Sequence, residues 1–176
     1  MSRLNGMRSE KLIISVNISI SQLTQDNFVE DVLHILEKTG MDAEYLELEI
    51  TESILMKNIE SNLKKIEMLK NHGIKVALDD FGTGYSSLTY LKRLPIAILK
   101  LDKAFVDGIA VSKTDNDIAR SINMLAHNLD LKVVAEGIET KEQLDCLAGF
   151  GCDMIQGFYI SRPLPEDKVE QFLQRD

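Results

Sequence analysis

The sequence is poor in the residues that mark several common classes of protein. It has two cysteines, Cys146 and Cys152, three histidines and no tryptophan. Both cysteines lie in or near apolar segments, with no histidine close by in the sequence. This pattern favours free thiols in a reducing compartment over a disulfide or a zinc site. We therefore expect a cytoplasmic protein without structural zinc.

Positive charge and long apolar runs are also scarce. The chain carries 20 Lys and Arg against 28 Asp and Glu, a net charge of -8, with no basic stripe. Binding to a nucleic-acid polymer is therefore not expected, although metal ions can bridge an acidic protein to a phosphorylated ligand. No apolar run approaches the ~20 residues that span a bilayer, and the N-terminus lacks a signal-peptide core. We expect no membrane segment.

The apolar residues that are present alternate between two periodicities. The chain of 176 residues is 44% hydrophobic, which fits one compact domain with a real core. Amphipathic segments lie between short apolar runs, and this alternation predicts an α/β protein with a parallel sheet covered by helices. The predicted strands are Leu12 to Val16, Tyr45 to Ile50, Ile74 to Leu78, Ile96 to Leu101, Lys132 to Ala135 and Met154 to Ile155.

Two architectures fit this alternation: a doubly wound sheet and a closed (β/α)8 barrel. The nucleotide-binding fingerprint of the first is missing, since no third glycine follows Gly82 and Gly84 at the required spacing. A barrel needs eight βα units and typically ~250 residues, whereas this chain has about six units. Three explanations for the missing units fit the sequence: an incomplete barrel, a barrel completed by another copy, or a gene product that continues upstream.

The most informative segment runs from Lys75 to Gly84. An apolar strand leads directly into Asp79 and Asp80, and two glycines follow. Paired carboxylates at a strand end are suited to hard cations such as Mg²⁺, while a helix cap is the plain alternative. Taken alone, the segment is compatible with a metal site and with a helix cap.

Polar residues stand at the ends of the other predicted strands as well. In a parallel sheet these ends lie on one face, where ligands bind. Crowded carboxylates repel one another, and a pair of Mg²⁺ or Mn²⁺ ions removes that conflict and can activate a water for phosphate-ester cleavage. Singly, each residue has an ordinary explanation, such as a helix cap at Asp102 or a Glu139–Lys141 ion pair. The residues concerned are Asn17, Glu49, Asp79, Asp80, Lys100, Asp102, Glu136, Glu139 and Gln156.

Six short motifs follow one another along the chain. They are Val16-Asn17-Ile18-Ser19, Glu49-Ile50-Thr51-Glu52-Ser53, Asp79 to Leu88, Leu99-Lys100-Leu101-Asp102, Val134-Ala135-Glu136-Gly137-Ile138-Glu139-Thr140 and Gln156-Gly157-Phe158. In this order they resemble the EAL family of bacterial cyclic di-GMP phosphodiesterases, from about Ile14 to Phe172. The resemblance implies a (β/α)8-type, TIM-barrel-like fold and Mg²⁺- or Mn²⁺-dependent hydrolysis of cyclic di-GMP to pGpG.

The same resemblance implies roles for individual residues. The implied metal ligands are Asn17, Glu49, Asp79 and Asp80. Lys100 and Glu136 match the groups around the attacking water, with Glu136 either a general base or a second-metal ligand. Glu52 matches the residue that steadies the loop from Asp79 to Ser86, which in the family couples dimerisation to metal binding. Gln156 and Glu139 are expected at the substrate pocket.

One departure from the family pattern affects the expected activity. The Glu-Ala-Leu tripeptide, whose Glu is a metal ligand in the family, occurs nowhere in this sequence. We therefore expect residues 1–176 to form a single EAL-type domain that lacks its first strands, with about six βα units and impaired hydrolysis. The alternative is an inactive module that binds cyclic di-GMP or a partner protein. We also expect a homo-oligomer that buries the open edges, and a regulatory or GGDEF domain upstream in the parent protein.

Overall fold

A single six-stranded parallel sheet organises the protein. The computed structural model describes residues 12–82 and 88–173. Strand order in the sheet equals order in the chain, so each strand pairs with the one before it and the one after it. The strands are β1 (Ile14–Asn17), β2 (Leu46–Thr51), β3 (Lys75–Phe81), β4 (Ile98–Leu101), β5 (Lys132–Ala135) and β6 (Met154–Ile155).

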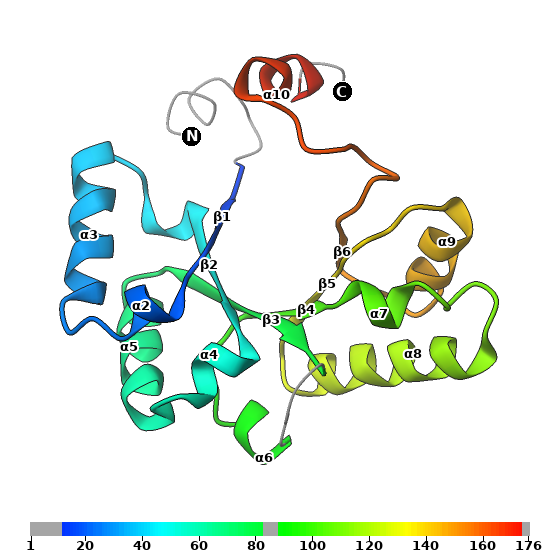
Figure 1. Ribbon diagram of the computed structural model, residues 1–176, viewed down its shortest axis with the longest axis horizontal. Helices are drawn as coiled ribbons and strands as arrows, with labels where there is room; N and C mark the ends of the chain where they lie inside the picture. The colour runs from blue at the N-terminus through cyan, green and yellow to red at the C-terminus, as the bar shows by residue number, and fades with distance from the viewer. Residues whose placement is uncertain (1–11, 83–87, 174–176) are drawn as a thin grey trace.

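The helices between successive strands lie around the outside of the curled sheet, whereas the last helix follows β6 and lies on the open side (Figure 1). A short 3₁₀ helix covers Ala43–Tyr45. The sheet forms a half-barrel that is open between β1 and β6, which confirms the predicted incomplete TIM-barrel-like fold. The helices are α2 (Ile20–Leu23), α3 (Phe28–Thr39), α4 (Glu52–Met56), α5 (Ile59–Asn71), α6 (Leu88–Leu91), α7 (Lys103–Val106), α8 (Lys113–Asn128), α9 (Lys141–Gly149) and α10 (Glu166–Leu173).

Local sequence signals fix several of these boundaries. The Thr140 hydroxyl accepts a hydrogen bond from the Gln143 backbone N–H, and the Gln143 side chain accepts from the Thr140 backbone N–H, so a capping box opens α9. Asp102 caps α7 by accepting from the Ala104 N–H at 2.9 Å, as its position after a strand predicted. Gly73, with φ of 85°, ends the turn after α5 in the left-handed region that favours glycine.

The third strand departs from its predicted end. It runs on to Phe81 instead of stopping at Leu78, because Phe81 regains pairing with Leu101 after a register shift. Asp80 lies within the shift and has a φ of 56°, a value uncommon for residues other than glycine. The two carboxylates therefore stand inside an irregular strand rather than in a loop after it.

The core fills the space between sheet and helices. Ile66 and Leu69 of α5, Leu99 of β4 and Leu147 of α9 are fully buried. Burying one such side chain contributes roughly 1.5–3 kcal/mol, so this layer holds the strand ends in fixed positions. No helix within residues 12–82 and 88–173 is long and apolar enough to cross a membrane.

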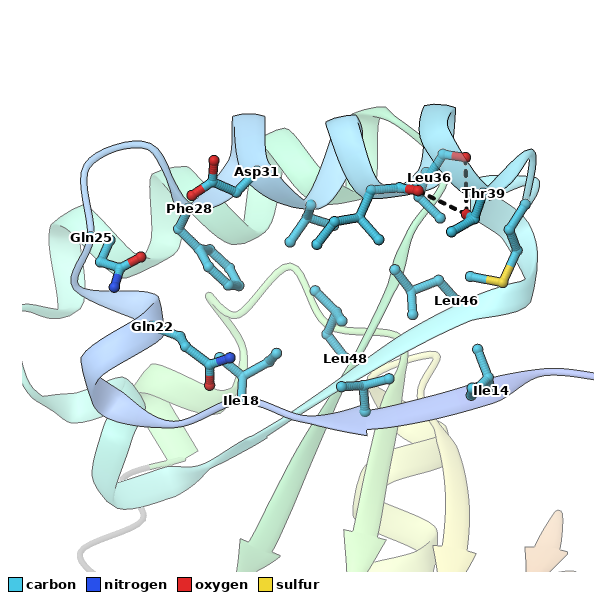
Figure 2. Close-up of a pocket in the computed structure, with 14 residues that line it drawn as sticks. Ile14, Ile18, Gln22, Gln25, Phe28, Asp31, Leu36, Thr39, Leu46 and Leu48 are labelled. Carbon is cyan, nitrogen blue, oxygen red and sulfur yellow. Dashed lines mark hydrogen bonds between the residues drawn. The ribbon is translucent and has the colours of Figure 1, made fainter. Parts of the chain in front are cut away.

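An apolar groove opens between α3 and the first two strands (Figure 2). Its volume is about 470 Å³, and Phe28 and Leu36 of α3 face Ile14 and Leu48 across it. β1 is an edge strand in this sheet, so the groove lies where the half-barrel stops. Its lining lacks the concentration of acids found at the strand ends.

Candidate functional site

The centre of the candidate site is the ammonium group of Lys100 on β4. Its Nζ lies 2.6 Å from Oε1 of Glu136, 2.8 Å from Oε2 of Glu49 and 3.7 Å from Oδ1 of Asp79. The Lys100 residue is only 3% exposed. One buried cation thus gathers carboxylates from three separate segments, which satisfies the expectation that acids from distant parts of the chain meet at one face.

Strand register explains how these groups meet. Glu49 stands opposite Ala77 and Thr51 opposite Asp79 in the β2–β3 ladder, while Lys100 stands opposite Val134 in the β4–β5 ladder. The Glu136 N–H donates to the Leu101 carbonyl at 3.0 Å, which extends β5 by one residue toward the site. All the side chains therefore come from the carboxyl ends of neighbouring parallel strands, the usual location of active sites in such barrels.

Burial and neighbouring charges shift the pKa values of the residues in this cluster in opposite directions. Burial lowers the pKa of Lys100, but its hydrogen bonds to Glu136 and Glu49 outweigh that effect and hold the pKa above its ordinary value. Burial raises the pKa of Glu136 above its usual range, although the hydrogen bond and the charge of Lys100 act against it. Lys100 therefore stays charged, while Glu136 is a stronger base than a free glutamate.

Asp80 completes the acidic pair on β3. Its backbone N–H donates to Oδ1 of Asp79 at 3.0 Å, which fixes the two residues relative to each other. Burial raises the pKa of Asp80, and the charges of Asp79 and Asp102 raise it further. A site that raises carboxylate pKa values in this way favours any additional cation that can enter it.

Asn17 and Glu52 lie at the ends of neighbouring elements. Asn17 is exposed at the end of β1 and stands opposite Glu49 in the β1–β2 ladder. Glu52 opens α4, is 4% exposed, and lines a small cavity beside Leu78 and Phe81. Residues 83–87 of the loop that Glu52 is expected to steady lie outside the described residues.

The remaining predicted residues lie on the rim rather than in the Lys100 cluster. Glu139 forms an ion pair with Lys103 of α7 rather than with Lys141, the partner named in its ordinary explanation. Lys141 instead contacts Asp145 one turn along α9. Lys103 and Glu139 are distant in the sequence but close in space, because α7 packs beside the segment after β5 at the strand ends. Gln156 is exposed immediately after β6, and its main chain hydrogen-bonds to Ala135 and Ile138.

The donor set suits a hard divalent cation. The candidate ligands Asn17, Glu49, Asp79 and Asp80 offer only carboxylate and amide oxygens, which Mg²⁺ and Mn²⁺ prefer. The carboxylates of Glu49, Asp79 and Glu136 already surround one positive charge, the ammonium group of Lys100. Within the described part of the chain, no three His, Cys, Asp or Glu residues stand ready in a metal-holding arrangement. The chemistry of the ligands fits, and the side chains need to rearrange around an ion.

One buried acid beside the site had not been predicted. Glu47 is 6% exposed and accepts a hydrogen bond from the Ser15 hydroxyl at 3.1 Å, and burial raises its pKa. Alternation along a strand places Glu47 on the same face as Glu49. That spacing was visible in the sequence, but only the tertiary structure shows that both side chains are buried.

The fold and the site together define a class: a (β/α)-barrel-type domain with an acidic site at the carboxyl ends of its strands. Comparison with known families then gives the particular family. The EAL domain family matches residues 1–163, and the chain belongs to that family.

Sequence similarity to two cyclic di-GMP enzymes supports this assignment. The cyclic di-GMP phosphodiesterase NbdA of Pseudomonas aeruginosa is 46% identical over 165 residues, 94% of this chain and 21% of NbdA. The bifunctional diguanylate cyclase/cyclic di-GMP phosphodiesterase MucR of the same organism is 40% identical over 156 residues, 89% of this chain and 23% of MucR. The chain therefore spans about a fifth of the length of these relatives.

Solved structures show the same fold. A cyclic di-GMP complex of the MucR phosphodiesterase superposes with a TM-score of 0.88 at 39% identity, covering 96% of this chain and 68% of that one. The manganese and cyclic di-GMP complex of Klebsiella pneumoniae BlrP1 has a TM-score of 0.79 at 32% identity, covering 86% and 39%. Another BlrP1 structure contains calcium and cyclic di-GMP.

Proposed function

We propose that this chain acts as a phosphodiesterase domain that hydrolyses cyclic di-GMP to pGpG with Mg²⁺ or Mn²⁺. The observation that carries the proposal is the contact of Lys100 with Glu49, Asp79 and Glu136 at the strand ends. The named activities of NbdA and MucR, and the ligands of the related crystal structures, support the choice of substrate and metal.

In this proposal Asn17, Glu49, Asp79 and Asp80 hold the divalent cations. When bound, such ions activate water and neutralise charge on the phosphate. Lys100 contributes a permanently positive group beside the carboxylates and stabilises negative charge that develops on the phosphodiester oxygens. Glu136 accepts the proton of the attacking water on a carboxylate oxygen, and burial favours that role because it raises the pKa of this group.

The rim residues and the surroundings of the domain are part of the same proposal. Glu139 and Gln156 border the substrate, and Glu52 steadies the loop after Asp80. The domain works in the cytoplasm as a homo-oligomer, within a parent protein that carries a regulatory or GGDEF domain. The size and bifunctional name of MucR are consistent with that last point.

A second candidate function, binding of cyclic di-GMP without efficient hydrolysis, is favoured by a gap in the family pattern. The sequence contains no Glu-Ala-Leu tripeptide, so one carboxylate ligand that the family supplies is missing. Removing groups outside the direct ligands already weakens metal sites ~10–100-fold, and removing a ligand is expected to weaken binding more. Slow hydrolysis, or binding of cyclic di-GMP without hydrolysis, is therefore the expected behaviour of residues 1–176.

Chromatography of cyclic di-GMP incubated with the full chain and Mn²⁺ tests the activity. We expect slow conversion to pGpG, and Glu136→Gln is expected to lower the rate by ~10²–10⁴-fold as removal of a general base does. Asp145→Asn, on the exposed face of α9, is the control and leaves the rate unchanged. Turnover that survives Glu136→Gln would contradict the assigned base, and rates of ~1–10³ s⁻¹ would contradict the expected impairment.

Calorimetry with cyclic di-GMP and Ca²⁺ separates the two functions. Binding without detectable hydrolysis in Mn²⁺ favours the binding module, whereas binding with hydrolysis favours the enzyme. Absence of both in the folded chain would overturn the proposal.

A further inference from the structure

A hydrogen bond between two side chains joins the edge strand β1 to β2 directly behind the candidate site. The Ser15 hydroxyl donates to Oε1 of Glu47 at 3.1 Å, and these two residues stand opposite each other in the β1–β2 ladder. Because side chains alternate along a strand, the next pair on the same face is Asn17 opposite Glu49, two of the candidate metal ligands. The Ser15–Glu47 pair therefore lies one step behind the proposed ligands.

Asn17 is the least firmly held of the candidate ligands. Glu49, Asp79 and Asp80 come from β2 and β3, which pair with a strand on either side, whereas β1 has four residues and pairs with β2 alone in the described part of the sheet (Figure 1). Residues 15–17 are exposed, whereas Glu49 is buried. Short exposed segments with few partners open locally more easily than central strands do. The position of Asn17 therefore depends on what fixes the register of β1.

The apolar pattern of β1 does not select one register. Ile14 and Val16 line the apolar groove, and a slip of β1 by one residue would turn them to the opposite face of the sheet. A slip by two residues keeps both on the groove face but moves Asn17 away from Glu49 along β2. This displacement is roughly 6.6 Å, whereas a Mg²⁺ ligand has to lie ~2.1 Å from the ion. A polar contact is needed to select the register that serves a metal site.

We propose that Glu47 is a positioning residue: by accepting the hydrogen bond from Ser15, it selects the register of β1 that places Asn17 beside Glu49. Glu47 is 6% exposed, and burial of a carboxylate is unfavourable unless hydrogen bonds or charges compensate it. Selection of one register is the best-attested use of such buried polar groups. On the far side of Asn17, the Ile18 N–H donates to the Glu49 carbonyl at 2.9 Å. The inference rests on the proposed function, because the register matters through Asn17 as a metal ligand.

The first test measures the affinity for Mn²⁺ alone, from the electron paramagnetic resonance signal of the free ion. Glu47→Leu removes the acceptor at a similar side-chain size, and we expect ~10–100-fold weaker binding, the usual effect of losing a group that orients a metal ligand. Glu47→Gln keeps an oxygen that accepts from Ser15, so it is expected to bind Mn²⁺ almost as the unchanged chain does. Ser15→Ala is expected to weaken binding as Glu47→Leu does, and the double variant to lose nothing further.

A matched control separates positioning from a general loss of stability. Asn123 is another buried polar residue, 1% exposed, and it donates to the Phe150 carbonyl at 2.9 Å on the outer side of the sheet. Asn123→Leu is expected to destabilise the fold without changing the affinity for Mn²⁺. The inference is overturned if Glu47→Leu binds Mn²⁺ as tightly as the unchanged chain, or if Asn123→Leu loses as much affinity. It is also overturned if Asn17→Ala keeps the affinity that Glu47→Leu loses.

A second test needs no metal and separates the inference from the proposed function. Hydrogen exchange of the Ile18 N–H is expected to be faster in Glu47→Leu and not in Glu47→Gln, because a shift of β1 breaks its bond to the Glu49 carbonyl. If the unchanged chain binds no Mn²⁺, the proposed metal site fails, and faster exchange in Glu47→Leu would still uphold Glu47 as the residue that sets the register. Equal exchange in Glu47→Leu and the unchanged chain would refute the inference, whether or not metal binds.

Discussion

Ion pairs at the two ends of the same sheet differ in kind. At the carboxyl ends, the buried Lys100 faces three carboxylates, so the cluster keeps an excess of negative charge. At the amino ends, Oδ2 of Asp153 lies 2.7 Å from Nε2 of His127 and accepts the Val133 N–H at 2.9 Å. That second group is half-exposed and joins α8, β5 and the turn before β6.

The difference between the two ends indicates a functional role for the Lys100 cluster and a structural role for the Asp153 group. Around Asp153, a single carboxylate accepts hydrogen bonds from two donors. Around Lys100, Glu49, Asp79 and Glu136 share one ammonium group, and burial keeps the pKa of Glu136 raised in spite of it. Burying several like charges together destabilises a fold, and such groups cluster at functional sites. The comparison therefore supports the proposed chemistry at the carboxyl ends and a structural role for the Asp153 group at the amino ends.

Removing Lys100 is expected to have the largest effect on stability. Lys100→Met leaves three carboxylates close together without their cation, and breaking a buried pair by deleting one partner costs ~3–5 kcal/mol. Urea denaturation at pH 7 measures this loss. Lys141→Met, which removes an exposed pair on α9, is the control and is expected to leave the free energy of unfolding nearly unchanged. A loss below about 1 kcal/mol for Lys100→Met would mean that the cluster is far less strained than its geometry suggests.

Adding Mn²⁺ is expected to have the next largest effect, and only through the carboxyl ends. A ligand at 100 times its Kd stabilises the folded state by about 2.7 kcal/mol, which a thermal melt records as a higher Tm. Asp79→Asn is expected to abolish this increase because it removes a proposed ligand. Asp153→Asn removes a carboxylate from the opposite end and is expected to keep the full increase. An increase that persists in Asp79→Asn would move the metal away from the proposed site.

Patterns that depend on neighbours in the chain predicted most of the fold. The β5 and β6 ranges and the cap at Asp102 are confirmed, because each rests on hydrogen bonds or periodicity within a few residues. The gathering of acids was predicted from one topological fact, that parallel strands end on one face. The shared contact of Glu49 and Glu136 with Lys100 follows from that fact.

Features that depend on distant segments were not predictable in the same way. The register shift that extends β3 to Phe81 depends on pairing with Leu101, a partner that no local pattern identifies. Glu139 pairs with Lys103 rather than with Lys141, although Lys141 is much closer in the sequence. The stacking of Arg162 on Phe158 joins residues at a spacing that also occurs in ordinary turns. In each case packing between elements decides among contacts that the sequence alone leaves open.

The smallest expected effect concerns the tie at the amino ends, and it depends on pH. Burial raises the pKa of Asp153, but the hydrogen bonds from His127 and from the Val133 N–H outweigh it, so the pKa in the folded protein is below its usual value. A lowered folded pKa means that the carboxylate stabilises the protein above its unfolded pKa of about 3.9, and that this contribution disappears as the pH falls through the folded value.

We therefore expect Asp153→Asn to cost about 1 kcal/mol at pH 7, the worth of an ordinary hydrogen bond at a partly exposed site, and progressively less toward pH 3. Urea denaturation across this pH range measures the difference, with Asp145→Asn on α9 as a control that costs about 0.3–0.5 kcal/mol at pH 7. A cost for Asp153→Asn that stays constant down to pH 3 would show that the tie depends on shape rather than charge. The amino ends would then contrast with the carboxyl ends even more strongly, because charge would matter only where the candidate ligands are.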